Sequence, residues 1–541
     1  MASCLPKRLV IAVPTFSISD FERPLALLTR SIRLKHAEQN DEALICLNDL
    51  LSEYPRFLPA VFRRAIMFAD MNRYDDALAD FDSYLAYQPD ADDVLQLRNE
   101  ILEWALNDLS ALVNDASQKT TALFRRGSLF MQIHEYARAI NDFTEYLAQI
   151  PDDKDALNHI GNALLALNRH EEALAVFERL SSLAPEYSSV WFNRGNVLQQ
   201  LNRLDEAIQS YEYALQLQPD FPETHMELAH CKLSQENYVE GWMHFEWRWK
   251  TAWLKDQYID SPQPLWLGQT SLRGRTILLW AEQGLGDAIQ FVRFVSQVAD
   301  LAGQVILYVH PSLLPLLSRM DERIRAISHE LPLPAHDVHC PLMSLPFALG
   351  IAPSLHTMPR RYLCADPERL RAWQTRLGPA TRVRVGLAWC GRQYGLRNQS
   401  RDIRLALLKP LTDQKIDFIS LQKENPPQDT ECLGKLPNVR CFSSDLTDFA
   451  ETAALIECLD LVISVDTSIA HLAGSLGKPC WMLLRYSVEW RWMLERNDSP
   501  WYPSLKLYRQ SHPGDWTSAI QALAEDLHEL LPVANACAKL E

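Results

Sequence analysis

The stretch VWFNRGNVLQQLNRLDEAIQSYEYALQLQP, residues 190–219, decides the fold of the first half of the chain. Gly195 and Ala207 place small side chains where two consecutive helices can approach to contact distance. Tyr211 is a large side chain that fills the groove beside them. Pro219 ends the second helix, because proline cannot continue an α-helix. The stretch therefore predicts a pair of packed helices followed by a turn.

The positions that define this helix pair recur with a period of 34 residues. Pro55 and Pro89 extend the same spacing toward the N-terminus, with an irregular stretch over residues 91–119. Units of two helices at a fixed period predict a helical solenoid. The recurring positions are Gly127, Gly161 and Gly195; Ala43, Ala77, Ala139, Ala173 and Ala207; Phe143, Phe177 and Tyr211; and Pro151, Pro185 and Pro219.

This pattern resembles the tetratricopeptide repeat. The resemblance implies an α-superhelix over residues 24–255 whose concave surface binds peptides or partner proteins. The last repeat is rich in tryptophan, and we expect its aromatic face to be buried against the next domain. Residues 1–23 form a separate N-terminal segment, in which the apolar run Leu9–Val13 is too short for the core of a signal peptide.

Beyond Pro264, strands alternate with helices, which favours parallel sheets. The strands fall into two sets, which predict two Rossmann-like lobes over residues 265–375 and 381–541. Ligands of open α/β sheets bind at the carboxyl ends of the strands. The expected strands are residues 275–280, 305–310, 383–389, 417–421, 439–442, 460–465, 479–484 and 505–508.

The first motif, EQGLGD at residues 282–287, lies between the first expected strand and a helix. Gly284 and Gly286 let the backbone turn tightly and approach a ligand. Asp287 fits two roles, a cap of the helix or a base in the cleft. The segment GLGDAIQFVRF resembles the opening of bacterial heptosyltransferases, and this resemblance implies that Asp287 is the general base, with Glu282 as the second candidate.

The second motif is the strand ending at Val465 followed by Asp466, Thr467 and Ser468 at the start of a helix. Free amide groups and a partial positive charge make such a helix start a seat for phosphate. A plain N-cap is the alternative. The run SVDTSIAHLAGSLGKP resembles the nucleotide-sugar phosphate motif of heptosyltransferase-like enzymes, which implies donor binding by these residues and His471.

Three further polar residues follow second-lobe strands. Gln422 and Lys423 end one strand, and a lysine there can neutralise a leaving diphosphate. Arg401 can bind phosphate as well. No Asp-x-Asp sequence occurs after residue 260, so we expect no metal site and no cofactor beyond the nucleotide-sugar substrate.

Composition limits the partners. The 541 residues carry a net charge of −16, which disfavours nucleic acid and anionic membrane surfaces. The 11 cysteines are an odd number and scattered, which favours a reducing compartment, with the cytoplasm as the expected location.

The whole chain resembles bacterial proteins that join tetratricopeptide repeats to a GT-B glycosyltransferase domain, and its architecture is similar to that of O-GlcNAc transferase and flagellin glycosyltransferases. The resemblance implies a metal-independent, inverting enzyme that glycosylates Ser or Thr of a protein held by the repeats, flagellin among the candidates. A glycan-modifying transferase and a catalytically inactive scaffold are the alternatives. Arg401-Asp402-Ile403-Arg404 and Arg485 depart from the pattern of these relatives.

Overall fold

The computed structural model describes residues 22–354, 358–391, 401–412, 416–487 and 489–537. The chain divides into two compact units, residues 1–183 and residues 184–541, and each is described by itself. Residues 1–21 of the expected N-terminal segment lie outside the described residues.

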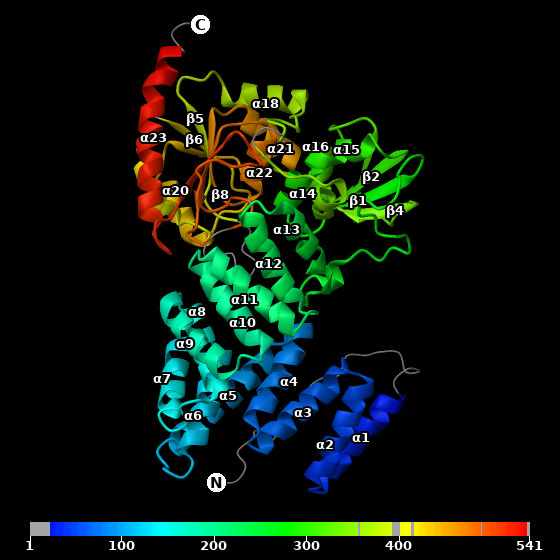
Figure 1. The fold of residues 1–541 in the computed structure, drawn as a ribbon, viewed down its shortest axis with the longest axis vertical. Helices are drawn as coiled ribbons and strands as arrows, with labels where there is room; N and C mark the ends of the chain where they lie inside the picture. Colours follow the sequence, from blue (N-terminus) through cyan, green and yellow to red (C-terminus); the bar gives the residue numbers. More distant parts are fainter. Residues whose placement is uncertain (1–21, 355–357, 392–400, 413–415, 488, 538–541) are drawn as a thin grey trace. The chain divides into compact units, whose positions relative to one another are not determined.

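The first unit consists of antiparallel helix pairs (Figure 1). The glycine column has a steric cause, because a Cβ atom on Gly161 would lie 2.5 Å from Phe177 Cζ. The stretch that breaks the period holds one long helix, α5. The helices are α1 (Glu22–His36), α2 (Asn40–Glu53), α3 (Leu58–Asp70), α4 (Tyr74–Tyr87), α5 (Asp92–Leu112), α6 (Lys119–Gln132), α7 (Tyr136–Leu147), α8 (Lys154–Ala166) and α9 (His170–Leu183).

The second unit begins with two more helix pairs and continues into the sheets. The helices are α10 (Ser188–Gln200), α11 (Leu204–Leu217), α12 (Pro222–Ser234) and α13 (Tyr238–Phe245). Trp242 of α13 is 2% exposed, and its ring centroid lies 5.4 Å from that of Trp490 and 6.0 Å from that of Phe291. The expected burial of the last repeat is therefore confirmed for Trp242, whereas Trp253 stays 48% exposed.

Two parallel sheets follow, and they confirm the prediction of two α/β lobes. The first sheet has the order β3-β2-β1-β4, and the second has the order β10-β9-β8-β5-β6-β7. The strands are β1 (Thr276–Trp280), β2 (Gln304–Val309), β3 (Ile324–Ser328), β4 (Val338–Pro341), β5 (Arg384–Ala388), β6 (Asp417–Ser420), β7 (Val439–Cys441), β8 (Leu461–Val465), β9 (Cys480–Leu484) and β10 (Leu505–Arg509).

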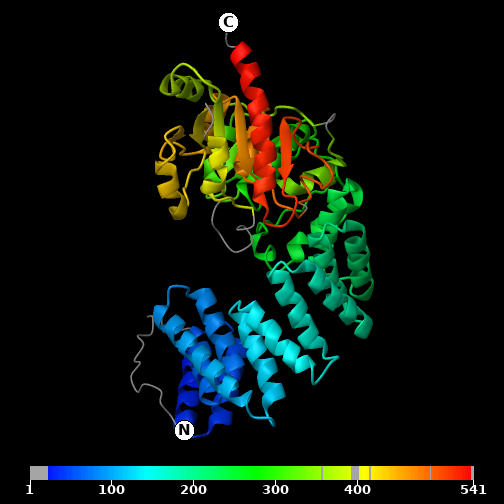
Figure 2. The same cartoon turned by 90° about the vertical axis from the view of Figure 1, so that its left-hand side faces the viewer.

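The helices of the lobes cover these sheets, and α23 packs against β9 and β10 (Figure 2). The helix expected after the first motif begins at Leu285 and is interrupted by a 3-10 turn before α15. The α-helices are α14 (Leu285–Phe291), α15 (Val295–Ala299), α16 (Leu314–Leu317), α17 (Leu345–Leu349), α18 (Pro367–Leu377), α19 (Lys409–Thr412), α20 (Thr430–Gly434), α21 (Phe449–Glu457), α22 (Ser468–Ser475) and α23 (Trp516–Cys537).

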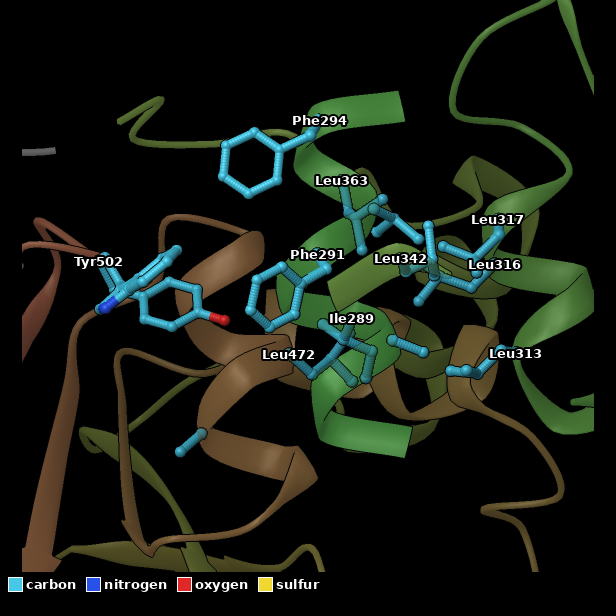
Figure 3. Close-up of a cluster of buried hydrophobic side chains, with 14 of the residues drawn as sticks. Ile289, Phe291, Phe294, Leu313, Leu316, Leu317, Leu342, Leu363, Leu472 and Tyr502 are labelled. Carbon is cyan, nitrogen blue, oxygen red and sulfur yellow. The ribbon is translucent and has the colours of Figure 1, made fainter. Parts of the chain in front are cut away.

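The two lobes share a hydrophobic core between α14 and α22. Ile289 and Phe291 of the first lobe lie beside Leu472 and Tyr502 of the second, and all four are at most 1% exposed (Figure 3). Burial of these side chains fixes α14 against α22, so the two helix starts are held at a defined separation. Among the described residues, no helix combines the length and the hydropathy that crossing a bilayer requires.

Candidate functional site

The first strand-to-helix turn connects β1 to α14 and ends in a carboxylate cap. Gln283 has a φ of 54°, in the left-handed region of backbone conformation, directly ahead of Gly284. The backbone N–H of Gly284 donates to Asp287 Oδ2 at 2.9 Å. Asp287 therefore caps its helix, as one of the two sequence interpretations requires, and the same side chain also lines a cavity.

The second turn connects β8 to α22 and ends in a hydroxyl cap. Thr467 Oγ1 accepts a hydrogen bond from the Ile469 backbone N–H at 3.3 Å and lies 3.1 Å from Ser464 Oγ. Because the Thr467 hydroxyl carries no charge, it does not compensate the positive end of the α22 dipole. This helix start keeps the electrostatic property that favours binding of an anion.

Both turns open into one cavity of about 550 Å³. This volume suits a ligand of the size of a small organic cofactor or substrate. Eight of the residues expected at the site line this cavity. They are Gly284, Gly286, Asp287, Arg401, Asp466, Thr467, Ser468 and His471.

Gly286 is the point at which the two turns approach each other. A Cβ atom on Gly286 would lie 2.8 Å from His471 Cδ2 and 3.4 Å from Ser468 Cα. The first of these distances is shorter than van der Waals contact allows, so any larger residue would push the turns apart. Glycine at this position is thus required by the contact between the lobes.

His471 is 5% exposed, and its Nδ1 lies 2.8 Å from the Tyr502 hydroxyl. Burial lowers the pKa of His471 well below its usual range, and the charges of Arg491, Arg293 and Arg401 act in the same direction. The imidazole is therefore neutral near pH 7. With the tyrosine hydroxyl donating to Nδ1, the ring would carry its proton on Nε2 and could donate to a ligand.

Arg491 joins the two lobes at the cavity wall. Its Nη2 forms an ion pair with Asp287 Oδ1, its Nε donates to Gln290 Oε1 at 2.8 Å, and its Nη1 donates to Glu489 Oε1 at 2.5 Å. Burial lowers the pKa of Arg491, but the charges of Glu489, Asp287 and Asp466 outweigh burial and raise it above its usual range. Arg491 is therefore a fixed cation between carboxylates.

Three other arginines line the cavity, namely Arg401, Arg485 and Arg509. Arg509 donates from Nη2 to the carbonyl oxygen of Met493 at 2.7 Å. Burial lowers the pKa of Arg509 to about 10, although the charge of Glu489 opposes this, and it remains a cation at neutral pH. Together with Arg491, these side chains give the cavity four arginines against the carboxylates of Asp287, Asp466 and Glu489.

Glu282 is not placed to act as a base. Its side chain is 1% exposed, and its two carboxylate oxygens accept hydrogen bonds from Nε and Nη2 of Arg248, both at 2.8 Å. Arg248 follows the last repeat and is 0% exposed. Since Arg248 engages both of its oxygens, Glu282 anchors the repeats to the first lobe instead.

Gln422 and Lys423 also lie outside the cavity lining. Gln422 Oε1 accepts from the backbone N–H of Trp389 at 3.1 Å, and Lys423 Nζ donates to the carbonyl oxygen of Leu446 at 2.6 Å. The sheet order explains this, because β5 separates β6 from β8. Lys423 therefore does not line the cavity, whereas four arginines do.

Sequence reasoning missed Arg491, Glu489 and Arg509. Arg491 lies between two tryptophans that are buried in the core, at 4% exposure for Trp490 and 0% for Trp492. A charged residue between two core tryptophans was the available signal, since a buried charge requires a partner.

Comparisons with known proteins agree with this architecture. Residues 124–188, 160–222 and 192–240 match the tetratricopeptide repeat family. Residues 444–514, which contain the second turn and Arg491, match the family described as glycosyltransferase family 9 (heptosyltransferase).

A distant homologue is protein FlbA of Caulobacter vibrioides, which is 25% identical over 319 residues, or 54% of this chain and 52% of FlbA. The chain thus spans about half the length of this curated relative. Similar solved structures include the crystal structure of MamA, which is 16% identical, with a TM-score of 0.28, over 30% of this chain and 96% of that chain. A tetratricopeptide repeat protein from Parabacteroides merdae is 17% identical, with a TM-score of 0.28, over 43% of this chain and 95% of that chain.

Proposed function

Because the chain combines tetratricopeptide repeats with a glycosyltransferase family 9 domain, we propose that it transfers a sugar from a nucleotide-sugar to Ser or Thr hydroxyls of a protein. The observation that carries this proposal is that the start of α22 and Asp287 of α14 line the same cavity. The helix start and the arginines suit an anion, and Asp287 supplies a proton acceptor, which are the two parts that sugar transfer from a diphosphate needs.

The donor diphosphate binds at the start of α22 in this proposal. The backbone amides of the first helical turn and the hydroxyl of Ser468 donate to its oxygens. His471 adds a neutral N–H donor, and the arginines of the cavity supply the positive charge. Because arginine and helix dipole neutralise the leaving group, the reaction proceeds without a metal ion.

Asp287 is the proposed base. The acceptor oxygen attacks the anomeric carbon from the face opposite the diphosphate, and its proton passes to the carboxylate of Asp287. The bond between the anomeric carbon and the phosphate oxygen breaks as the new bond forms. The diphosphate leaves with the electron pair, so the configuration of the sugar is inverted.

The repeats hold the protein acceptor in this proposal. The last repeat supports this, since Trp242 and Arg248 fasten it to the lobes that form the cavity. An acceptor bound along the helices of the second unit would therefore be positioned relative to Asp287. A glycan acceptor has no need of such a protein-binding surface.

The donor site is tested by thermal unfolding of the full chain with UDP, GDP, ADP, CDP and dTDP. A ligand present at about ten times its Kd stabilises a protein by about 1.4 kcal/mol, which corresponds to a shift of about 1–2 °C for a chain of this length. We expect one nucleotide to give such a shift, and His471→Ala to abolish it. The matched control is His512→Ala, because His512 is exposed and lies outside the cavity lining.

The acceptor is tested with a radiolabelled sugar on the nucleotide that shifts the melting temperature, and with a lysate of cells that carry a close relative of this chain. The full chain should label protein, with the label released by β-elimination from Ser or Thr. A chain of residues 184–541, which form a compact unit and keep α10–α13, should retain donor hydrolysis and lose only the part of the protein labelling that depends on the helices of the first unit. Label in glycans alone would favour a glycan acceptor. In the thermal unfolding experiment, a melting temperature that no nucleotide changes would favour a scaffold.

A further inference from the structure

The contact between Arg491 and Asp287 places the proposed base in an ion pair with a cation at the wall of the donor cavity. Both oxygens of the carboxylate already accept hydrogen bonds, Oδ1 from Arg491 Nη2 and Oδ2 from the Gly284 N–H, so the acceptor hydroxyl must compete with them. The pair therefore opposes the function proposed for Asp287. The inference below rests on that proposed function. It concerns how Oδ1 of Asp287 becomes free to accept a proton when the donor is present.

We infer that Arg491 is shared: it holds Asp287 in the donor-free protein and turns to the diphosphate when the nucleotide-sugar binds, which releases Asp287 as the base. Arg491 lines the same cavity as Thr467, Ser468 and His471. Its planar guanidinium group matches the oxygens of a phosphate as well as those of a carboxylate. A diphosphate carries more charge than Asp287 and competes for the same N–H groups.

Geometry indicates that the contact with Asp287 is the one that exchanges. Glu489 holds the arginine locally, since its Oε1 accepts from Nη1 at 2.5 Å and its Oε2 accepts from the backbone N–H of Arg491 at 2.9 Å. Asp287, by contrast, comes from the other lobe, 204 positions away in sequence. Rotation of the guanidinium about its anchor at Glu489 would break the pair with Asp287 and, with it, the contact of Nε with Gln290 Oε1.

Asp287 keeps its position when the arginine turns away. Its Oδ2 accepts from the Gly284 N–H at 2.9 Å, on the side of the carboxylate opposite the ion pair. The released oxygen, Oδ1, then lies in the cavity as a proton acceptor. Donor binding thus activates the base and delays proton abstraction until a sugar is in place.

A double-mutant cycle measured by calorimetry tests this inference, with the nucleoside diphosphate that shifts the melting temperature most as the probe. Asp287→Asn should tighten binding about fivefold, because the arginine no longer has a competing carboxylate. Arg491→Gln should weaken binding at least tenfold. In the Arg491→Gln background, Asp287→Asn should change the affinity less than twofold.

The cycle distinguishes two effects of Asp287 on binding: competition with the diphosphate for Arg491, and direct repulsion of the diphosphate. A carboxylate that only repels the diphosphate through space would give at least as large a gain without the arginine, and this result would overturn the inference. Arg491→Lys serves where the glutamine variant does not fold, since it keeps the charge that Glu489 requires. Arg496→Lys is the matched control, because Arg496 pairs with Asp498 and Glu236 outside the cavity lining.

The outcomes also distinguish this inference from the proposed function. If the wild-type chain binds no nucleoside diphosphate, the proposed function fails, and the inference fails with it. If the wild-type chain binds one and the cycle shows no coupling between Asp287 and Arg491, only the inference fails.

Discussion

The two turns that face the cavity have the same local architecture and different caps. Each connects a parallel strand to a helix, α14 in the first lobe and α22 in the second. In the first turn, Asp287 caps the helix with a carboxylate, so the positive helix end is already neutralised. In the second turn, Thr467 caps the helix with a hydroxyl, which adds no charge.

This difference shows that the capping residue decides whether a helix start attracts an anion or supplies a proton acceptor. A carboxylate cap gives a turn with a proton acceptor and little attraction for anions. A hydroxyl cap gives a turn that attracts a diphosphate. The proposed enzyme uses one turn of each kind, and the following substitutions exchange or disturb their properties.

Asp287→Asn removes the charge from the first turn and should have the largest effect. Asparagine can still accept from the Gly284 N–H, so the helix cap is kept, but the side chain cannot take a proton. We expect sugar transfer to fall by about a thousandfold, within the usual range for loss of a general base. Turnover of the labelled donor measures this, with Asp300→Asn, an exposed residue of the same lobe, as the control.

Thr467→Asp gives the second turn the carboxylate cap of the first. The helix stays capped, but the added negative charge opposes the diphosphate, and we expect nucleoside diphosphate binding to weaken about a hundredfold. Thr467→Asn introduces a side chain of the same shape without charge. Equal Kd values for the Asp and Asn variants, measured by calorimetry, would contradict the assignment of this turn as the diphosphate-binding site.

Gly286→Ala pushes the two turns apart. The added Cβ atom would lie 2.8 Å from His471 Cδ2, and such overpacking costs about 2 kcal/mol of stability. We expect a lower melting temperature together with weaker nucleotide binding. Gly434→Ala is the control, because a Cβ atom there meets nothing within 4 Å; a similar loss in both variants would refute the close approach of the turns.

A change of pH should have the smallest effect, through His471. Burial keeps the folded-state pKa of His471 below its usual value, whereas the unfolded chain takes up a proton near pH 6.5. The stability that neutral His471 contributes is therefore present above pH 6.5 and is lost as the pH falls. Between pH 6.5 and pH 5.5, the wild type should lose about 1 kcal/mol more than His471→Gln in thermal unfolding, and parallel losses would argue against a neutral, buried ring.

The sequence predicted the two turns because each is contiguous: a strand, a few cap residues and a helix. Residues 282–287 and 466–471 carry those signals within one short stretch. The sequence placed Lys423 correctly at a strand end but could not reveal that β5 separates β6 from β8. It assigned Glu282 to the cleft because it could not show the partner Arg248, which lies 34 residues away.

Arg491 could not be predicted because its role depends on contacts between lobes. Its partners Asp287 and Gln290 belong to α14, about 200 positions earlier. No period or motif in the loop between β9 and β10 points to them. Only the packing of α14 against α22 brings these side chains together.

The most direct test of the central claim is a crystal structure of the full chain with a bound nucleoside diphosphate. The account predicts phosphate oxygens within hydrogen-bond distance of the Ser468 backbone N–H, His471 Nε2 and Arg491, with Asp287 across the cavity. A diphosphate bound at the carboxylate-capped start of α14, or anywhere outside this cavity, would contradict it.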